Sequence, residues 1–308
     1  MSLISYFVDQ PLPSVAFQLS SAFLSGILVS PKERKIKDHF ICPLEKGVIQ
    51  PSFNQSNIQN LPLLERRMKE SLARFRFSER KIACLIPESS IKAFVFSFES
   101  LPASRKEQEQ LIRFRVKKQM PLLPEDSVLT FARGFSAGSV KVLAAVARRS
   151  MIDEVEKFFE RFGLRVRAIS IPSLVLNNLV DKEKAENFLL VNIEDDSLSL
   201  VATINSEMSL YRLKSFIPEP QTSLASAQRI ETVVREVENT LRFIEDKERK
   251  KLQRLWLRSG LLQGGEDILS RLKERPGLPL MGIESCLEAS LGLKERKILS
   301  PLAGQILQ

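Results

Sequence analysis

Apolar residues alternate with polar ones in several stretches of the first half of the chain, which is the pattern of half-buried β-strands. Val15, Phe17 and Leu19 begin an uncharged run over residues 14–30. We interpret this run as a buried β-hairpin that turns near Ser20 and Ser21. Further apolar runs predict strands over residues 81–86, 91–98, 140–147 and 165–171. The short polar stretch between the first two of these predicts a second hairpin.

Two helices are predicted in the middle of the chain by apolar positions that recur at helical spacing. One begins after Ser104 and ends before Pro121, and its exposed face is basic. The other begins at Ser150, where Ser150 and Asp153 match a capping box, and it ends at Gly163. The middle of the chain is therefore predicted to mix helices with strands.

The second half opens with a predicted three-strand meander over residues 188–193, 197–204 and 208–216. A long amphipathic helix follows, with apolar residues from Ile230 to Ile244 on one face. The remaining predicted elements are strand 255–258, helix 267–275 and strand 278–281. Two regions, near residues 14–98 and 188–308, thus share one order of elements, a meander followed by helices, without any sequence repeat.

The composition is that of a globular protein of about two domains, with 308 residues of which 44% are hydrophobic and 27% charged. It excludes collagen-like, low-complexity and disordered chains. The net charge of +9 is unevenly distributed. Residues 1–150 hold 23 basic and 13 acidic side chains, a balance of +10, whereas residues 151–308 hold 23 and 24. All of the positive excess therefore lies in the first half.

Cysteine and histidine are too few for several kinds of site. Cys42, Cys84 and Cys286 are odd in number and far apart, which disfavours a secreted disulfide framework and indicates a reducing compartment. His39 is the only histidine, which argues against a Cys/His zinc site, and no metal site is predicted. The run over residues 14–30 is at the short edge of a membrane span, and no basic region precedes it as in a signal peptide. We therefore expect a cytoplasmic protein.

The order of short motifs in the middle of the chain is its most specific feature. The motifs are Leu101-Pro102, Leu111-Ile112-Arg113-Phe114, Pro121-Leu122-Leu123-Pro124, the Ala-rich strand 142–147 and Gly163-Leu164. This series resembles the PilM-like family of type IV pilus assembly proteins, part of the actin-like ATPase superfamily and related to FtsA and the GspL cytoplasmic domain.

The resemblance implies an α/β fold, the actin-like (RNase H-like) two-lobe fold, with mixed sheets flanked by helices and a small inserted αβ subdomain. It assigns residues 1–186 to the first lobe, with the inserted subdomain at about 88–165. It assigns residues 187–308 to the second lobe, whose C-terminal helix returns toward the first.

The resemblance also implies loops that would bind ATP and Mg²⁺, and the first of these departs from the family pattern. Such loops follow a strand that ends in Asp-Ile-Gly, because the carboxylate acts through Mg²⁺ and glycine lets backbone N–H groups approach the phosphates. In the first loop Gln18 replaces the Asp and Ser20 replaces the Gly, and Ser21 follows.

The other two loops depart from the pattern as well. In the second, Asn192 stands where a carboxylate is expected, and Glu194 would bring a negative charge toward a polyphosphate. The third, an adenosine-contacting glycine pair, is reduced to Ser259-Gly260. We therefore expect a degenerate nucleotide cleft and a pseudo-ATPase that works without a cofactor, with ATP and Mg²⁺ disfavoured.

The predicted helix after Ser104 carries six basic and two acidic side chains, a local balance of +4. Such a run is typical of a solvated face, of a surface that attracts anionic inner-leaflet lipids, or of one that binds an acidic partner. It lacks interleaved Tyr or Trp, so nucleic acid is not expected. One wall of a partner-binding groove is predicted at Ile112, Arg113, Phe114, Arg115, Val116 and Lys117. Arg115 departs from the family, which commonly has Glu there.

The function implied by the resemblance is that of a non-catalytic scaffold of a type IV pilus or related secretion machine, at the inner face of the inner membrane through its partners. It would bind the N-terminal peptide of a PilN-like inner-membrane protein between the first lobe and the inserted subdomain, and pilus motor ATPases would be further partners. Two alternatives stay open. One is a weak actin-like ATP-binding protein, and the other is a GspL-like component of type II secretion.

Overall fold

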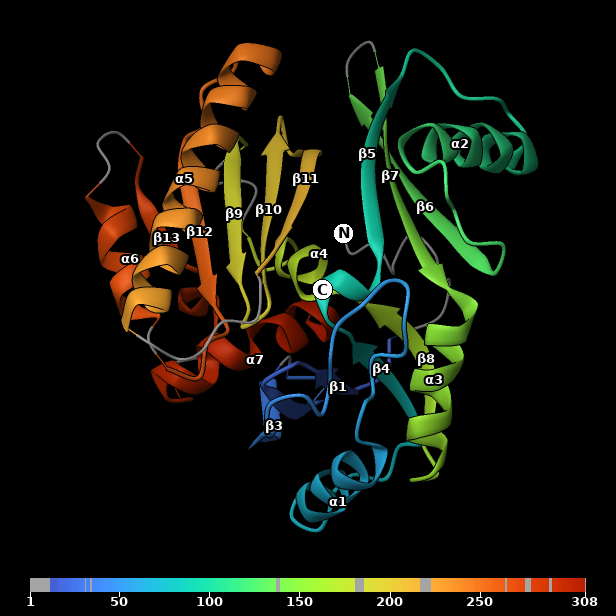
Figure 1. Ribbon diagram of the computed structural model, residues 1–308, viewed down its shortest axis with the longest axis vertical. Coiled ribbons are helices and arrows are strands. Elements are labelled where there is room, and N and C mark those ends of the chain that lie inside the picture. Colours follow the sequence, from blue (N-terminus) through green and yellow to red (C-terminus); the bar gives the residue numbers. More distant parts are fainter. Residues whose placement is uncertain are drawn as a thin grey trace.

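The computed structural model of the chain describes residues 12–30, 32–33, 35–136, 139–180, 186–216, 223–263, 265–274, 278–287 and 290–307. The strands in these ranges form two five-stranded sheets and one three-stranded sheet. In Figure 1 the first sheet lies at the bottom, the second at the left and the small sheet at the upper right. We call the units built on them the first lobe, the second lobe and the inserted subdomain.

The first lobe is built on a sheet with the strand order β3-β2-β1-β4-β8. Its antiparallel meander consists of β1 (Val15–Leu19), β2 (Phe23–Ser30) and β3 (Lys35–Pro43). The strands β4 (Lys81–Leu85) and β8 (Arg165–Ser170) extend it in parallel. Helices α1 (Leu61–Leu72) and α3 (Arg149–Glu160) pack on one face, and α4 (Pro172–Leu176) and α7 (Leu293–Ile306) pack on the other. Because both faces are covered, every residue of β1 is buried.

The second lobe repeats this topology in the order β11-β10-β9-β12-β13. Its meander consists of β9 (Phe188–Ile193), β10 (Ser197–Ile204) and β11 (Glu207–Ser215), and β12 (Arg254–Ser259) and β13 (Leu280–Gly282) run parallel to β9. Helices α5 (Ser223–Glu248) and α6 (Glu266–Lys273) pack on one face of the sheet. A short 3-10 turn at Ile283–Cys286 leads to α7.

Helix α7 ties the end of the chain to the first lobe. Its Leu299 and Leu302 are fully buried against residues of β1, β2 and β4. The backbone of α7 also approaches α4 closely, because a methyl group at Gly304 would lie 2.4 Å from the carbonyl oxygen of Val175. The two lobes therefore share one helix, and their relative position depends on its packing.

The inserted subdomain lies between β4 and β8 in the chain and is built on the sheet order β5-β7-β6. Its antiparallel strands are β5 (Lys92–Phe98), β6 (Ser127–Ser136) and β7 (Ser139–Arg148). Helix α2 (Arg105–Gln119) covers one face through the fully buried Ile112 and Val116. Strand β11 of the second lobe contacts all three strands of this sheet, so α2 forms the outer layer on the side away from the second lobe (Figure 1).

The predicted hairpin over residues 14–30 and the meander after residue 188 are confirmed, as are the helices after Ser104, Ser150 and Ile230. The second hairpin is wrong, because β4 already has β1 and β8 as parallel neighbours on both sides and β5 pairs with β7 instead. A 3-10 turn over Glu88–Ser90 joins them.

The capping box at Ser150 is also wrong. The Ser150 hydroxyl donates to Asp126 Oδ2 at 3.0 Å, and the N-cap of α3 is Arg148 without a side-chain bond. Strands β3 and β6 and helix α1 were not predicted at all.

Candidate functional site

The ends of β1, β9 and β12 meet where the two lobes face each other, and an ion pair lies at their centre. Arg258, the fifth residue of β12, is fully buried, and Glu194, the residue after β9, is 3% exposed. The guanidinium Nη1 of Arg258 contacts the Glu194 carboxylate in a salt bridge. Because a buried charge is unfavourable without a partner, each of these two side chains requires the other.

The remaining donors of Arg258 bind groups on two other elements. Its Nη1 donates to Asn192 Oδ1 at 3.0 Å, and its Nε and Nη2 donate to the carbonyl oxygens of Lys297 and Ile298 at 2.8 and 3.1 Å. Lys297 and Ile298 belong to α7. One guanidinium therefore links β12, the end of β9 and the helix that the lobes share.

Three side-chain hydrogen bonds cross from the first half of the chain to the loop after β9. Gln18 Nε2 donates to Glu194 Oε1 at 3.4 Å, Ser21 Oγ to Asp196 Oδ1 at 3.0 Å, and Ser89 Oγ to Asp196 Oδ2 at 3.3 Å. Burial, followed by the charge of Glu194, raises the pKa of Asp196 to about 6. The lobes are thus joined by polar side chains at the position where the family pattern would have a nucleotide.

Glu88 forms a second polar junction, and this role was not predicted from the sequence. Its carboxylate accepts from the backbone N–H and hydroxyl of Ser173 at 2.6 and 2.8 Å, from Asn192 Nδ2 at 3.2 Å and from the Tyr211 hydroxyl at 2.9 Å. Glu88 is fully buried, and this burial raises its pKa to about 7 in spite of those donors. We interpreted Glu88 as a hairpin turn residue, and no local signal in the sequence distinguishes it from one.

The seven residues predicted for a degenerate nucleotide cleft all lie at these strand ends. Gln18, Ser21, Asn192 and Glu194 take part in the bonds described above. Ser20 caps its own turn, because its Oγ accepts from the N–H of Ala22 at 3.3 Å. Ser259 is buried and its Oγ has no hydrogen-bond partner among the described residues.

Gly260 shows how the site is filled. A methyl group at this glycine would lie 2.4 Å from Arg258 Nη1 and 2.6 Å from Glu194 Oε2. Arg258 also neutralises Glu194, which we had expected to present an unpaired negative charge to a polyphosphate. The Arg258 guanidinium and the Glu194 carboxylate thus lie against the glycine that would approach a nucleotide, and the loops as arranged do not fit Mg²⁺ and a polyphosphate. The Ser259 hydroxyl and Glu194 Oε2 have no hydrogen-bond partner among the described residues. Within the described residues, no three His, Cys, Asp or Glu side chains are grouped as metal ligands.

The six residues predicted as a partner-binding wall lie on α2, where two of them face inward. Ile112 and Val116 are fully buried in the core of the inserted subdomain. Phe114, Arg115 and Lys117 are exposed, and Arg113 is half-buried and pairs with Glu109 at 3.4 Å. Only these four can contact a partner.

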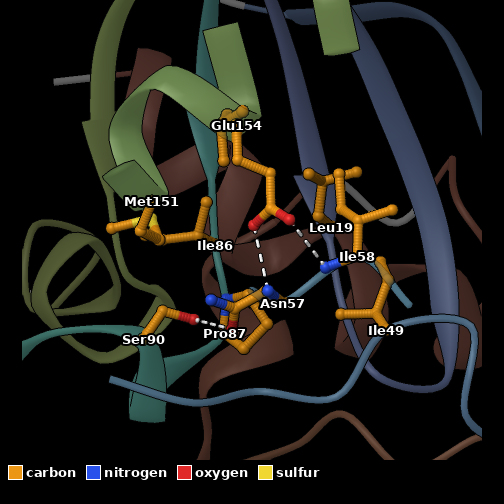
Figure 2. Close-up of a pocket in the computed structure, with 10 residues that line it drawn as sticks. Leu19, Ile49, Asn57, Ile58, Ile86, Pro87, Ser90, Met151 and Glu154 are labelled. Carbon is orange, nitrogen blue, oxygen red and sulfur yellow. Dashed lines mark hydrogen bonds between the residues drawn. The ribbon is translucent and has the colours of Figure 1, made fainter. Parts of the chain in front are cut away.

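A separate small pocket lies where the first lobe meets the inserted subdomain (Figure 2). It is lined mainly by apolar side chains, among them Leu19, Ile58, Ile86 and Met151, and has a volume of about 10 Å³. The Glu154 carboxylate at its edge accepts from the backbone N–H groups of residues 57 and 58 at 2.9 and 3.2 Å. That carboxylate therefore holds the segment around residues 56–58 against α3, and no α2 residue lines the pocket.

Comparisons with known proteins identify the fold. No protein-family model matches the sequence, and no curated protein matches it. A chain of a PilM–PilN type IV pilus biogenesis complex is similar with a TM-score of 0.75 and 16% identity, over 97% of this chain and 98% of that one. A Bacteroides thetaiotaomicron protein with an actin-like ATPase fold and unknown function has a TM-score of 0.53 and 11% identity, with 94% of each chain covered.

The cytoplasmic domain of EpsL, an inner membrane component of the Vibrio cholerae type II secretion system, has a TM-score of 0.50 and 10% identity over 94% of this chain and 93% of that one. The chain therefore has the actin-like fold, and the predicted α/β two-lobe class is confirmed. The resemblance inferred from the motifs in the middle of the chain is confirmed at the level of the fold.

No helix in the described ranges combines the length and apolar character needed to cross a bilayer.

The ion pair gives a stability prediction. Arg258→Met leaves Glu194 charged and buried without its partner, so we expect the free energy of unfolding to fall by about 3–5 kcal/mol. Glu194→Leu should also destabilise, because it leaves the buried guanidinium unpaired, and the double variant Arg258→Met/Glu194→Leu should lose less than the sum of the two single losses. Urea denaturation of the four proteins measures this cycle.

The exposed pair Arg271–Glu274, at 3.2 Å, is the matched control, and Arg271→Ala should cost about 1 kcal/mol or less. Additive losses in the cycle would show that the Arg258–Glu194 contact has no energetic role.

Glu88 gives a prediction for pH dependence. Its pKa is raised from 4.5 to about 7 in the folded state, so the stability linked to it is complete below about pH 4.5 and is lost as pH rises through 7. Glu88→Gln imitates the protonated form, because its amide can donate to the Ser173 or Tyr211 oxygen. We expect this variant to remove a decline on the order of 3 kcal/mol between those pH values.

The measurement is the urea midpoint at a series of pH values. Glu125→Gln, which changes an exposed carboxylate, should leave the wild-type slope unchanged. The same slope in Glu88→Gln as in the wild type would show that Glu88 is not the titrating group. Asp196 keeps its own smaller effect of the same sign in both proteins.

Proposed function

We propose that this protein is a non-catalytic scaffold of a type IV pilus or related secretion platform, located in the cytoplasm at the inner face of the inner membrane. It binds the N-terminal cytoplasmic segment of a PilN-like membrane protein. The observation that carries this proposal is the full-length likeness to a chain of a PilM–PilN complex, which includes the inserted subdomain. Motor ATPases of the machine are further candidate partners.

The filled cleft supports the non-catalytic part of the proposal. A nucleotide would have to displace Arg258 from Glu194 and Asn192, and it would leave the Lys297 and Ile298 carbonyl oxygens without their donor. Breaking such a buried pair costs several kcal/mol, which nucleotide binding would have to offset. The lobes are also already joined by Gln18, Ser21 and Glu88, so no ligand is required to bring them together.

The junction of the first lobe with the inserted subdomain supports the peptide-binding part. The pocket there is apolar, which suits the anchor side chain of a short peptide. At about 10 Å³ it is too small for such a side chain as it stands, so binding requires the segment around residues 56–58 to move. A peptide N–H can replace the hydrogen bonds of this segment to Glu154. Asn57 is also bonded to Gln50, Ser52 and Ser90, so these bonds have to shift when the segment moves. The exposed residues of α2 remain a predicted second wall.

The EpsL likeness favours a second candidate function of the same class, a component of type II secretion. The two candidates differ in their partner and agree on a scaffold without nucleotide chemistry. A capture experiment with the solubilised inner membrane distinguishes them, because it identifies the inner-membrane protein that binds.

Peptide binding is the direct test of the proposed function. The full chain should bind a synthetic N-terminal peptide of the PilN-like protein from the same genome, measured by isothermal titration calorimetry. Ile58→Lys puts a charge at the pocket and should weaken binding by about ten-fold or more, because the charge would lose its hydration there. Phe114→Ser tests the predicted α2 wall in the same titration.

Phe243→Ser changes an exposed phenylalanine on α5, far from the junction in the fold, and should bind the peptide like the wild type. Circular dichroism verifies that each variant is folded. Absence of peptide binding by the wild type, together with the capture of no inner-membrane assembly protein, would overturn the proposal.

Nucleotide binding is tested separately by thermal unfolding. A ligand that binds the folded state raises Tm, so millimolar Mg·ATP should leave Tm unchanged if the cleft is filled as described. A clear rise in Tm that is lost in Asn192→Ala or Ser259→Ala would establish the weak ATP-binding alternative and overturn the pseudo-ATPase assignment. Asn54→Ala, at an exposed position outside the cleft, serves as a matched variant.

A further inference from the structure

The outer face of α2 and the turn after it carry two exposed apolar side chains. Phe114 is 55% exposed and Leu122 is 92% exposed, the largest fractions among the large hydrophobic residues in the described ranges. Both orientations follow from their neighbours. Ile112 and Val116 fix the inward face of α2, and Met120 and Leu123 on either side of the turn pack on the subdomain core. Phe114 and Leu122 therefore lie outside the core of the subdomain.

Exposed basic side chains lie on the same helix as Phe114. Lys118 lies over the Phe114 ring at 4.7 Å from its centroid, and Lys106 and Lys117 are exposed on the same helix. In the described structure no carboxylate pairs with any of these three lysines, since the ion pairs of α2 are limited to Arg113 with Glu109. We call this surface, formed by Lys106, Phe114, Lys117, Lys118 and Leu122, the α2 patch.

We propose that the α2 patch binds directly to the surface of an anionic lipid bilayer. Phe114 and Leu122 enter the interfacial region, and the three lysines contact the lipid headgroups. Aromatic and aliphatic side chains flanked by lysines are the composition of helices that lie on membranes. The long lysine stems keep their ammonium groups in water and at the headgroups while apolar neighbours enter the bilayer.

Two observations favour a lipid surface over a protein partner. Beside Arg113 and Arg115 the helix presents three exposed lysines, and lysine is depleted in the cores of protein interfaces. The patch also lies on the outer layer of the subdomain, on the side away from the second lobe (Figure 1), and the junction pocket is lined by other elements. The helix can therefore lie on a flat membrane while the junction pocket stays accessible.

The inference does not depend on the proposed function, because it concerns lipid and not a protein partner. Two apolar side chains and three lysines give only a weak and reversible association, in the same way as a single lipid anchor does. A second attachment to a membrane protein would raise the overall affinity through effective concentration.

Vesicle sedimentation with the full chain tests the proposal. The probes are vesicles of phosphatidylethanolamine and phosphatidylglycerol and vesicles of phosphatidylcholine alone. We expect the wild type to sediment with the anionic vesicles only, and less as salt is raised. Lys117→Glu/Lys118→Glu should lower the partition coefficient by about ten-fold or more, since each lysine near the surface contributes about five-fold. Phe114→Ser/Leu122→Ser should lower it as well.

The chain provides a matched control on α5, where Lys247 lies over the Phe243 ring at 5.3 Å with the same spacing of four residues. Phe243→Ser/Lys247→Glu should bind vesicles within about two-fold of the wild type. Circular dichroism and the urea midpoint of the same proteins verify that they are folded, so that loss of lipid binding by a folded variant is attributed to the patch.

Three results would overturn the proposal: no binding of the wild type to anionic vesicles, equal binding to neutral ones, or unchanged binding by both patch variants. Capture of an acidic protein by the patch, without vesicle binding, would also overturn it and would identify the patch as a protein interface. These results leave the peptide test of the proposed function unaffected, because that test contains no lipid.

Discussion

The structure depends most on the buried contact between Arg258 and Glu194. A guanidinium and a carboxylate that are both removed from water are stable only while each has its partner and its remaining hydrogen bonds. Arg258 meets this requirement by binding two carbonyl groups of α7, the helix that packs on the first lobe. The constraint therefore reaches beyond the second lobe. Moving α7 away from β12 would leave charged and polar groups unpaired, so the pair fixes the helix on which the arrangement of the lobes depends.

Glu88 has the corresponding position on the first-lobe side. It follows β4 and begins the connection to the inserted subdomain. Its carboxylate binds Ser173 of α4, and Asn192 and Tyr211 of the second lobe. Asn192 in turn accepts from Arg258, so the two junctions belong to one network. A network of this kind favours one arrangement of the lobes, because a partial opening leaves several buried groups unsatisfied at once. Polar side chains thus hold the lobes in the way that a bound ligand could.

The elements with clear periodicity were predictable from sequence, and those without it were not. The strands of the hairpin at residues 14–30 and of the meander after residue 188 are either apolar on both faces or alternate between apolar and polar residues. Strand β3, in contrast, is an edge strand with charged residues in an irregular order. The strand ends of the cleft were found because the order of elements locates them. The ion pair at these strand ends was not predicted, since Arg258 and Glu194 are 64 residues apart and the sequence around one gives no sign of the other. Glu88 was predicted to be a turn residue. It is buried by the second lobe, whose residues lie far along the chain, so the local sequence does not indicate its burial.

The distribution of charge now has a structural explanation. The acidic groups of the cleft bind Arg258 and neutral donors, so they do not pair with the excess basic residues of the first half. That excess remains partly on α2, where three lysines have no carboxylate partner among the described residues and two apolar side chains are exposed. The cleft therefore pairs its charged groups internally, whereas α2 leaves three lysines unpaired among the described residues, which favours binding of other molecules on that outer side. The inserted subdomain, which carries the α2 patch and adjoins the junction pocket, is therefore the part of this actin-like fold in which interactions with other molecules are most to be expected.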